Sequence, residues 1–424
     1  MVSGYKKTEI GVVPSEWDVL SFGEVFRTLS NNTLSRDQLN YDSGSIKDIH
    51  YDDVLILFPE VLDCSRDDIP YVNSNSSVSG QPLQDGDVII SDTAEDETVG
   101  KAVEIANQEN TNIVAGLHTI PCRVKNSKFA SGWLGYFINS HYYHDQLLPY
   151  IHGTKVSSIA RESLADTYIA VPPYGEQEKI VNALTDIGGL ISESEKLIEK
   201  YQAMKQGCLQ HMFPHKGQTE PDMRLPGFAG AWEQRKLGDL IIKGGSGGTP
   251  SATRSEYYGG DIPFLTISDI KNRDIITTEK TLTKDGLINS TAWVAPAGAV
   301  SLAMYASVGK VGILSMDSAT SQAFFNMCFD DNTLRNFVYY RLVKADSEHE
   351  WEPLISTGTQ RNLNAEKVKQ FEVSIPQIEE MKEISDFLWK IDNLITLHQR
   401  KCEKYKMIKQ GMMEDLLTGK VRLK

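Results

Sequence analysis

A segment of about 40 residues occurs twice in this chain, and its pattern constrains the fold more than any other feature. Residues 175–213 align without gaps on a second copy that lies 204 residues further along. Ile180 aligns with Ile384, and the tract Tyr201–Gly207 aligns with Tyr405–Gly411. An ungapped match of this length is an internal repeat, so we expect two copies of one architecture.

The apolar residues within each copy recur at intervals of three and four, which is the period of a coiled-coil helix. Neither helix could bury this stripe alone, so we expect the two helices to pack on each other, antiparallel, within one chain. Lys205 and Lys409 interrupt the stripe at matching positions. Each lysine either reaches outward to water or makes a polar contact that fixes the helix register or docks a partner. The predicted coiled-coil and partner interface is Ile187, Ile191, Tyr201, Lys205, Ile391, Ile395, Tyr405 and Lys409.

A globular segment precedes each helix, and each segment opens near a tryptophan, Trp17 or Trp232, which we interpret as a core anchor. Short strand patterns separated by Gly, Pro, Asn and Asp fill both segments, with helices predicted at Trp133–Leu148 and Leu334–Val343. The predicted fold class is α+β: two globular domains with mixed β-sheets, separated by two long helices packed as an antiparallel coiled coil, with an internal pseudo-twofold repeat. The predicted limits are 1–173 for the first domain, 174–215 for the central helix, 216–376 for the second domain and 377–424 for the C-terminal helix.

Composition limits the class of protein and its compartment. The formal net charge is −14, and most of the acidic excess lies in the first 173 residues, which argues mildly against nucleic-acid binding but leaves room for a local basic surface. The five cysteines are scattered without a Cys-x-x-Cys pair, which fits a reduced cytoplasm and does not indicate a zinc site. No apolar run reaches the roughly 18 residues of a membrane span, so no membrane association is expected. We interpret His141–Asp145 as a polar helix face.

Motifs that would supply catalysis are incomplete. Val171-Pro172-Pro173-Tyr174 has the outline of an amino-methyltransferase motif, but Val171 has no side-chain acceptor for the target amine, so we interpret the prolines as a helix entry. Gly244–Gly248 lacks the Gly-Lys-Ser/Thr ending of a phosphate-binding loop. We therefore expect no catalytic residue, no metal site and no cofactor bound by this chain.

Several features together resemble a known family. They are the two Lys-Gln-Gly helices, the ending Leu416–Leu423, the segment Gly260–Thr266, the loop Ser356–Asn364 and the two divergent domains. This layout is similar to the specificity (S) subunit of type I restriction-modification systems.

The resemblance implies two target-recognition domains, each of which reads one half of a split site in double-stranded DNA. The helices would act as a ruler and dock two methyltransferase (modification) subunits, and restriction/translocase subunits would complete the complex. S-adenosylmethionine, ATP and Mg²⁺ would then belong to partner subunits, which carry out adenine-N6 methylation and ATP-dependent cleavage. A 38-residue helix is about 57 Å long, so antiparallel pairing would separate the domains by about one DNA turn, about 34 Å, or somewhat more.

DNA contacts require cations or hydroxyls for phosphates, and Arg, Lys, Asn or Gln for base edges. Lys310 and Gln360-Arg361 stand out because their loops recur in both domains. The residues predicted to contact DNA are Lys101, His118, Lys155, Ser157, Arg161, Ser246, Thr249, Arg254, Lys271, Tyr305, Lys310, Gln360, Arg361 and Asn362. Two other hypotheses are a coiled-coil scaffold with two protein- or glycan-binding domains and a self-sufficient fused methyltransferase. A DNA affinity that falls steeply with salt would exclude the scaffold, and the missing cofactor motifs disfavour the fused enzyme.

Overall fold

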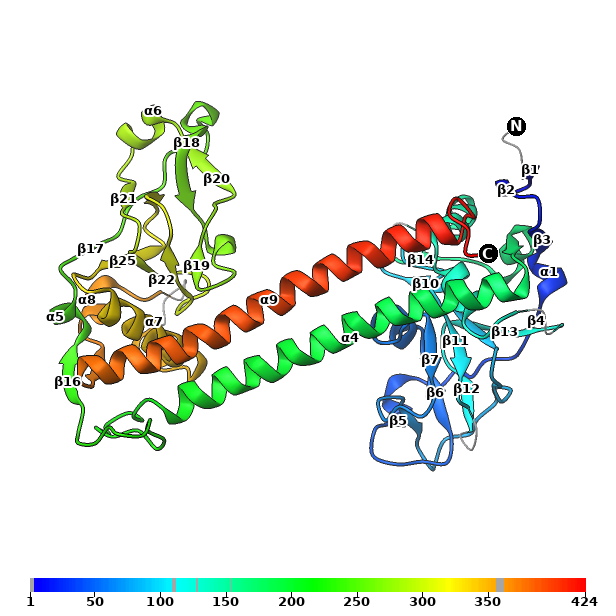
Figure 1. Ribbon diagram of the computed structural model, residues 1–424, viewed down its shortest axis with the longest axis horizontal. Helices are drawn as coiled ribbons and strands as arrows, with labels where there is room; N and C mark the ends of the chain where they lie inside the picture. The colour runs from blue at the N-terminus through cyan, green and yellow to red at the C-terminus, as the bar shows by residue number, and fades with distance from the viewer. Residues whose placement is uncertain (1–3, 109–111, 127–128, 154, 356–361) are drawn as a thin grey trace. The chain divides into compact units, whose positions relative to one another are not determined.

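The computed structural model describes residues 4–108, 112–126, 129–153, 155–355 and 362–424. The chain divides into two compact units: Met1–Ser192 with Cys402–Lys424 form the first, and Glu193–Lys401 the second. Two long helices, α4 (Tyr174–His211) and α9 (Ile378–Leu416), cross the boundary between the units (Figure 1). The residue limits of the four segments stay predictions.

Contacts within each unit show that α4 and α9 pair antiparallel, as the repeat predicts. In the second unit Tyr201 stacks on His398 with ring centroids 5.7 Å apart, and four residues later Lys205 Nζ lies 2.7 Å from Asp392 Oδ1. Moving forward on α4 therefore moves backward on α9. In the first unit, the start of α4 shares a buried core with Leu416 and Leu417 at the end of α9.

The globular part of the first unit contains two main sheets. A five-stranded mixed sheet has the order β4-β13-β9-β11-β7, and a four-stranded sheet has the order β12-β6-β8-β5. The first sheet comprises β4 (Phe26–Thr28), β13 (Thr119–Val124), β9 (Val88–Ser91), β11 (Ala102–Ala106) and β7 (Val61–Asp63). The second comprises β12 (Ile113–Ala115), β6 (Lys47–Ile49), β8 (Tyr71–Val72) and β5 (Leu39–Asn40). Smaller pairs are β1 (Tyr5–Thr8) with β2 (Gly11–Pro14), β3 (Asp18–Ser21) with β15 (Tyr168–Val171), and β10 (Thr93–Ala94) with β14 (Ser157–Ser158).

The second unit also has a five-stranded sheet, in the order β17-β25-β22-β23-β19, and a four-stranded sheet, in the order β20-β18-β24-β21. The first comprises β17 (Lys243–Gly245), β25 (Phe324–Cys328), β22 (Val300–Ala303), β23 (Val311–Leu314) and β19 (Asp274–Ile275). The second comprises β20 (Lys280–Leu282), β18 (Tyr258–Leu265), β24 (Ser318–Thr320) and β21 (Trp293–Ala295). A further pair joins β16 (Glu233–Lys236) to β26 (Glu372–Ile375). The shorter helices of the chain are α1 (Phe22–Val25), α2 (Trp133–Ile138), α3 (His141–Leu147), α5 (Leu237–Leu240), α6 (Lys284–Ile288), α7 (Asn332–Ser347) and α8 (Ala365–Lys369).

The two five-stranded sheets share one pattern. Each has three antiparallel pairings followed by one parallel pairing at its last edge, β11 with β7 and β23 with β19. The four-stranded sheets differ, because the parallel pair is at the edge in the first unit, β12 with β6, and central in the second, β18 with β24. The α+β class, the mixed sheets and the internal repeat are thus confirmed.

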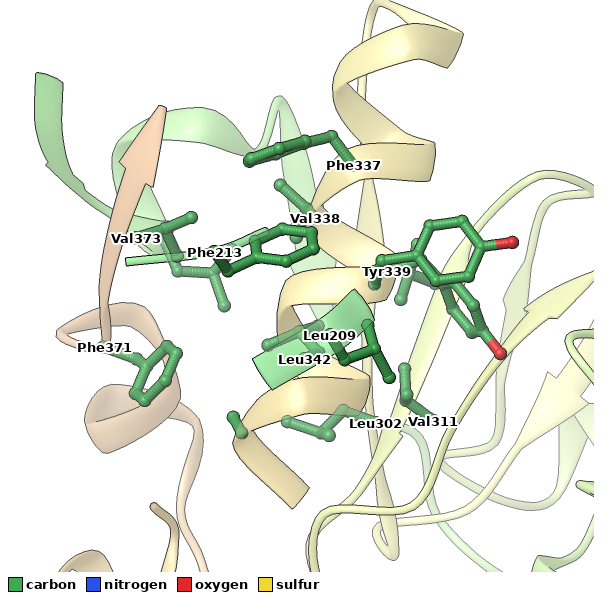
Figure 2. Close-up of a cluster of buried hydrophobic side chains, with 14 of the residues drawn as sticks. Leu209, Phe213, Leu302, Val311, Phe337, Val338, Tyr339, Leu342, Phe371 and Val373 are labelled. Carbon is green, nitrogen blue, oxygen red and sulfur yellow. The ribbon is translucent and has the colours of Figure 1, made fainter. Parts of the chain in front are cut away.

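The core of the second unit shows how the long helix joins the domain. Leu209 and Phe213, at and just after the end of α4, are buried among Phe337, Val338 and Leu342 of α7 (Figure 2). Burial of one such side chain contributes about 1.5–3 kcal/mol. Both entrance tryptophans are core residues as predicted: Trp17 is 0% exposed and Trp232 is 2% exposed.

An ion pair fastens the start of each long helix. Arg422, beyond the end of α9, donates to Glu176 at the start of α4 at 2.6 and 2.8 Å, and Trp17 Nε1 donates to the same carboxylate at 3.1 Å. Arg224, beyond the end of α4, donates to Glu380 at the start of α9 through Nε and Nη2, each at 2.7 Å. The start of each long helix is therefore held by an arginine from the segment that follows the other long helix.

The predicted single helix at Trp133–Leu148 is wrong, because α2 and α3 divide it. The break falls at Asn139, whose amide exchanges two hydrogen bonds with the backbone of Ala102 in β11, at 3.0 and 2.7 Å. Ser140 then caps α3 by accepting a hydrogen bond from the Tyr143 amide. The interpretation of His141–Asp145 as a polar face is also wrong in part, because Tyr143 is fully buried.

Candidate nucleic-acid interface

The Gly-Lys loop predicted to touch DNA recurs in both units with one backbone geometry. In the second unit the Ala303 amide donates to Lys310 O and the Gly309 amide donates to Ala303 O. In the first unit Ser91, Lys101 and Gly100 form the same two bonds. Gly309 has φ +99°, and a side chain there would collide with Asp346, so the loop requires glycine. The sequence therefore holds a lysine at a matching place on each five-stranded sheet.

The two lysines differ in what surrounds them. Lys310 is exposed, and burial raises the pKa of the adjacent Asp346 while the Lys310 charge opposes that rise. Lys101 is half-buried and donates to the backbone oxygen of Leu55 at 2.7 Å. Burial lowers the pKa of the Lys101 ammonium. Lys310 is thus placed to meet an outside anion, whereas Lys101 is held by its own domain.

Loops from distant parts of the sequence meet beside each Gly-Lys loop. In the second unit Tyr305 forms an isolated β-bridge with Asn362, and the Leu363 amide donates to Met304 O. In the first unit the corresponding pairing is β10 with β14, which contains Ser157. The structure therefore places Asn362 against the loop that carries Tyr305 and Lys310.

The other predicted contacts of the second unit lie on exposed loops with local partners. Arg254 pairs with Glu256 at 3.3 Å, and Lys271 pairs with Glu279 at 3.5 Å. Thr249 donates to Gln322 at 3.0 Å, and the neighbouring Ser246 is exposed. Surface pairs of this kind are weak enough to exchange for a phosphate. Gln360 and Arg361 lie outside the described residues.

The predicted contacts of the first unit are spread more widely. His118 adopts a left-handed backbone with φ +55°, and its Nδ1 lies 3.3 Å from Asp92. Lys155 and Arg161 are exposed, and Ser157 is half-buried. Their roles in DNA contact stay predictions.

A cleft of about 670 Å³ in the second unit lies between the Gly-Lys loop and the paired long helices. Five cations line it against three carboxylates, so it is net basic. The cations are Lys205, Lys271, Arg273, Lys310 and Arg400, and the carboxylates are Asp274, Asp346 and Asp392. Sequence reasoning missed Arg400 as a site residue, because an arginine on a long helix gives no signal beyond its charge.

The corresponding cleft of the first unit has about 740 Å³ and the opposite balance. Three lysines line it against four carboxylates. The lysines are Lys101, Lys406 and Lys409, and the carboxylates are Glu60, Glu97, Asp145 and Glu414. The cleft of the first unit is therefore slightly acidic and that of the second unit is net basic, so the two clefts differ in charge.

The lysine of each Lys-Gln-Gly motif lies over a tyrosine ring of its unit. Lys205 Nζ is 5.9 Å from the ring centroid of Tyr340, and Lys409 Nζ is 5.5 Å from that of Tyr136. Both lysines are largely buried in ion pairs, Lys205 with Asp392 and Lys409 with Glu60, each at 2.7 Å. Lys205 therefore joins the two helices, whereas Lys409 joins a helix to the globular domain.

Two further observations concern the described residues. Within them no group of three or more His, Cys, Asp and Glu side chains is placed to hold a metal ion. None of the helices formed by these residues is long and apolar enough to cross a bilayer.

Comparison with known proteins defines the class. The model of the type I restriction modification DNA specificity domain matches residues 14–201 and again residues 230–406, so it covers most of the chain in two copies. The chain belongs to this family of type I restriction-modification specificity subunits.

Individual relatives agree with this assignment. The type I restriction enzyme MjaX specificity subunit of Methanocaldococcus jannaschii is 26% identical over 99% of this chain and 97% of its own length. The HindI specificity subunit of Haemophilus influenzae is 31% identical over 45% of this chain and 42% of its own length.

A solved structure supports the fold. The crystal structure of a type I restriction-modification S subunit from M. genitalium has a TM-score of 0.59 at 10% identity. It covers 94% of this chain and 96% of that one.

Proposed function

We propose that each unit reads one half of a bipartite site in double-stranded DNA and that α4 and α9 set the distance between the halves. The observation that carries this proposal is the contrast between the sheets. The five-stranded sheets share one strand pattern, whereas the four-stranded sheets differ. A shared scaffold with divergent surroundings suits two readers of different base sequences, because loops carry the side chains that reach base edges.

The chemistry would lie in partner subunits. Two methyltransferase subunits would methylate adenine at N6 with S-adenosylmethionine, and restriction/translocase subunits would cleave DNA with ATP and Mg²⁺. The role of this chain is to hold the target sequence at a fixed position, which contributes through orientation of the reactants. We infer that the complex acts in the cytoplasm, where it would meet its DNA target.

The repeated glycines support docking of one partner at each copy of the motif. Gly207 and Gly411 lie inside helices, where alanine would be about 1 kcal/mol more stable. A methyl group added at either position meets no described atom within 4 Å, so internal packing does not require glycine there. Met204 and Ile408, three residues earlier in each copy, are 41% and 39% exposed. We propose that the modification subunit packs closely against the helix at Gly207 and at Gly411.

Reconstitution tests the proposal. The purified chain, the modification subunit and labelled S-adenosylmethionine should methylate DNA at one bipartite sequence, and neither protein alone should do so. DNA binding by the complex should weaken steeply as salt rises, because released counterions drive phosphate contacts. Methylation that ignores one half-site, or no methylation with the cognate partner, would contradict the proposal.

A further inference from the structure

Two arginines of the second unit converge on a single amide oxygen. Arg273 Nη2 donates to Asn336 Oδ1 at 2.8 Å, and Arg335 donates to the same atom through Nε and Nη2 at 3.2 and 3.0 Å. An amide oxygen has two lone pairs, so three N–H donors exceed its capacity. The cluster therefore holds more donors than its own acceptor can satisfy.

The positive charge of this pair is compensated only in part, by a nearby carboxylate and by the ring of Tyr339, whose centroid lies 5.8 Å from the Arg273 guanidinium carbon. The Arg273 side chain is only 10% exposed, and its buried Nε has no hydrogen-bond partner among the described residues. Asp274 lies 3.2 Å from Arg273, but its side chain is 46% exposed. Asp274, which faces water, is thus the carboxylate paired with Arg273, and the charges of Asp274 and Asp331 act on Arg335.

Arg335 also occupies an unfavourable place in its helix. It lies in the first turn of α7, where the helix dipole disfavours a cation. Asp331 caps this helix by accepting a hydrogen bond from the Leu334 amide at 2.8 Å, so that carboxylate is already engaged. Burial and the neighbouring Arg273 charge lower the pKa of the Arg335 guanidinium. An anion against the pair would offset the repulsion between Arg273 and Arg335 and would itself be favoured at the N-terminus of α7.

We propose that Arg273 and Arg335 form an anion site that takes one phosphate of the DNA backbone. The planar guanidinium presents paired donors that match two phosphate oxygens. Arg273 also lines the net basic cleft beside Lys271 and Lys310, so the site is continuous with the surface predicted to contact DNA. This inference rests on the proposed function, and it names a backbone contact that fixes register without reading a base.

Three variants test the site in the assembled complex. Arg335→Gln should weaken binding to cognate and unrelated DNA by the same factor, three- to tenfold, and should reduce the slope of log K against log salt by about 0.9, the value for one phosphate. Asn336→Asp should give the same loss, because its carboxylate occupies the anion position, yet it should raise the melting temperature of the isolated chain. Lys369→Gln removes a charge that pairs locally with Glu366 at 2.8 Å and should leave the slope unchanged.

The outcomes separate this inference from the proposed function. An unchanged salt slope in Asn336→Asp, or a lower melting temperature, would overturn the anion site even if the complex still methylates a bipartite sequence. If Arg335→Gln weakens assembly with the modification subunit but not the salt slope, the anion belongs to a partner carboxylate and the phosphate assignment fails. Should Arg335→Gln not fold, Asn336→Asp decides alone.

Discussion

The two units share a scaffold but differ in how they compensate charge. Each places the motif lysine over a tyrosine, Lys205 over Tyr340 and Lys409 over Tyr136. The two lysines and the two tyrosines each occupy matching positions of the repeat, 204 residues apart. The counterion comes from the paired helix in the second unit and from the globular domain in the first. The lysine and the ring are thus the common requirement, and the carboxylate is supplied by whichever element lies close. The two copies of the repeat therefore keep the same packing of lysine on tyrosine, but the carboxylate that balances the lysine comes from a different element in each unit.

The ion pairs at the two helix starts, Arg422 with Glu176 and Arg224 with Glu380, should have the largest effects on the unfolding free energy. Arg422→Ala leaves the carboxylate of Glu176, which is 4% exposed, without its main partner, and should cost about 3 kcal/mol of unfolding free energy. Arg224→Ala should cost a similar amount through Glu380, which is 1% exposed. Hydrogen exchange should localise each loss to the unit that holds the ion pair; a loss spread evenly over both units would contradict the assignment of each ion pair to the stability of one unit.

The stability that the ion pair of Arg422 and Glu176 contributes should depend on pH. Burial opposes ionisation of Glu176, but hydrogen bonds from Arg422 and Trp17 outweigh it and hold the pKa of that carboxyl below its ordinary 4.5. The stabilisation is therefore present at neutral pH and is lost as pH falls through the lowered pKa. Glu176→Gln should flatten the acid limb of a denaturation series; an unchanged limb would show that the pair contributes nothing.

A buried carboxylate in the first unit should act in the opposite direction. Burial raises the pKa of Asp48 to about 6. Its Oδ1 has no hydrogen-bond partner among the described residues and lies 3.6 Å from His50 Nε2. The folded state therefore binds a proton more tightly than the unfolded state, so stability falls as pH rises from about 4 to 6.

Asp48→Asn should raise the unfolding free energy by about 2 kcal/mol at pH 7 and by little at pH 4. Its amide also gains a donor that faces His50. Thermal melts at both pH values provide the measurement, and Asp42→Asn, at an exposed side chain, is the control. An equal effect of Asp48→Asn at both pH values would refute the assignment.

The motif lysines should contribute less. Lys205→Met and Lys409→Met should each cost about 1–2 kcal/mol, because a largely buried ion pair loses one member while the aliphatic stem is retained. Double-mutant cycles should find coupling between Lys205 and Asp392 and between Lys409 and Glu60. Zero coupling in either pair would leave the tyrosine contact as the whole role of that lysine.

The smallest effects should come from the open glycines. Gly207→Ala and Gly411→Ala should each stabilise the isolated chain by about 0.5–1 kcal/mol. Gly207→Leu and Gly411→Leu should weaken assembly with the modification subunit, whereas Gly189→Leu, which also meets no described atom within 4 Å at its added carbon, should not. Normal assembly of both leucine variants would remove these glycines from the docking surface.

The helical repeat could be predicted from sequence because its apolar period and its ungapped copies are local signals. The helix break at Asn139 could not be predicted from sequence, because it depends on hydrogen bonds to Ala102 in a distant strand. The order of the strands in each sheet could not be predicted either, since it depends on pairing between residues far apart in the sequence. The sequence favoured Lys310 over the other candidates but gave no reason to exclude Lys101, and only the fold shows that Lys101 is held by Leu55 O. The Arg273–Arg335 convergence carries no sequence signal, because Asn336 joins residues from separate elements.

Lengthening both helices in step tests most directly the claim that two readers are held at a set spacing. Seven residues inserted at matching positions of α4 and α9 preserve the heptad and add about 10 Å. Methylome sequencing of cells that carry this variant should show both half-sites unchanged and the unread spacer longer by about three base pairs. An altered half-site with the original spacer would contradict the account.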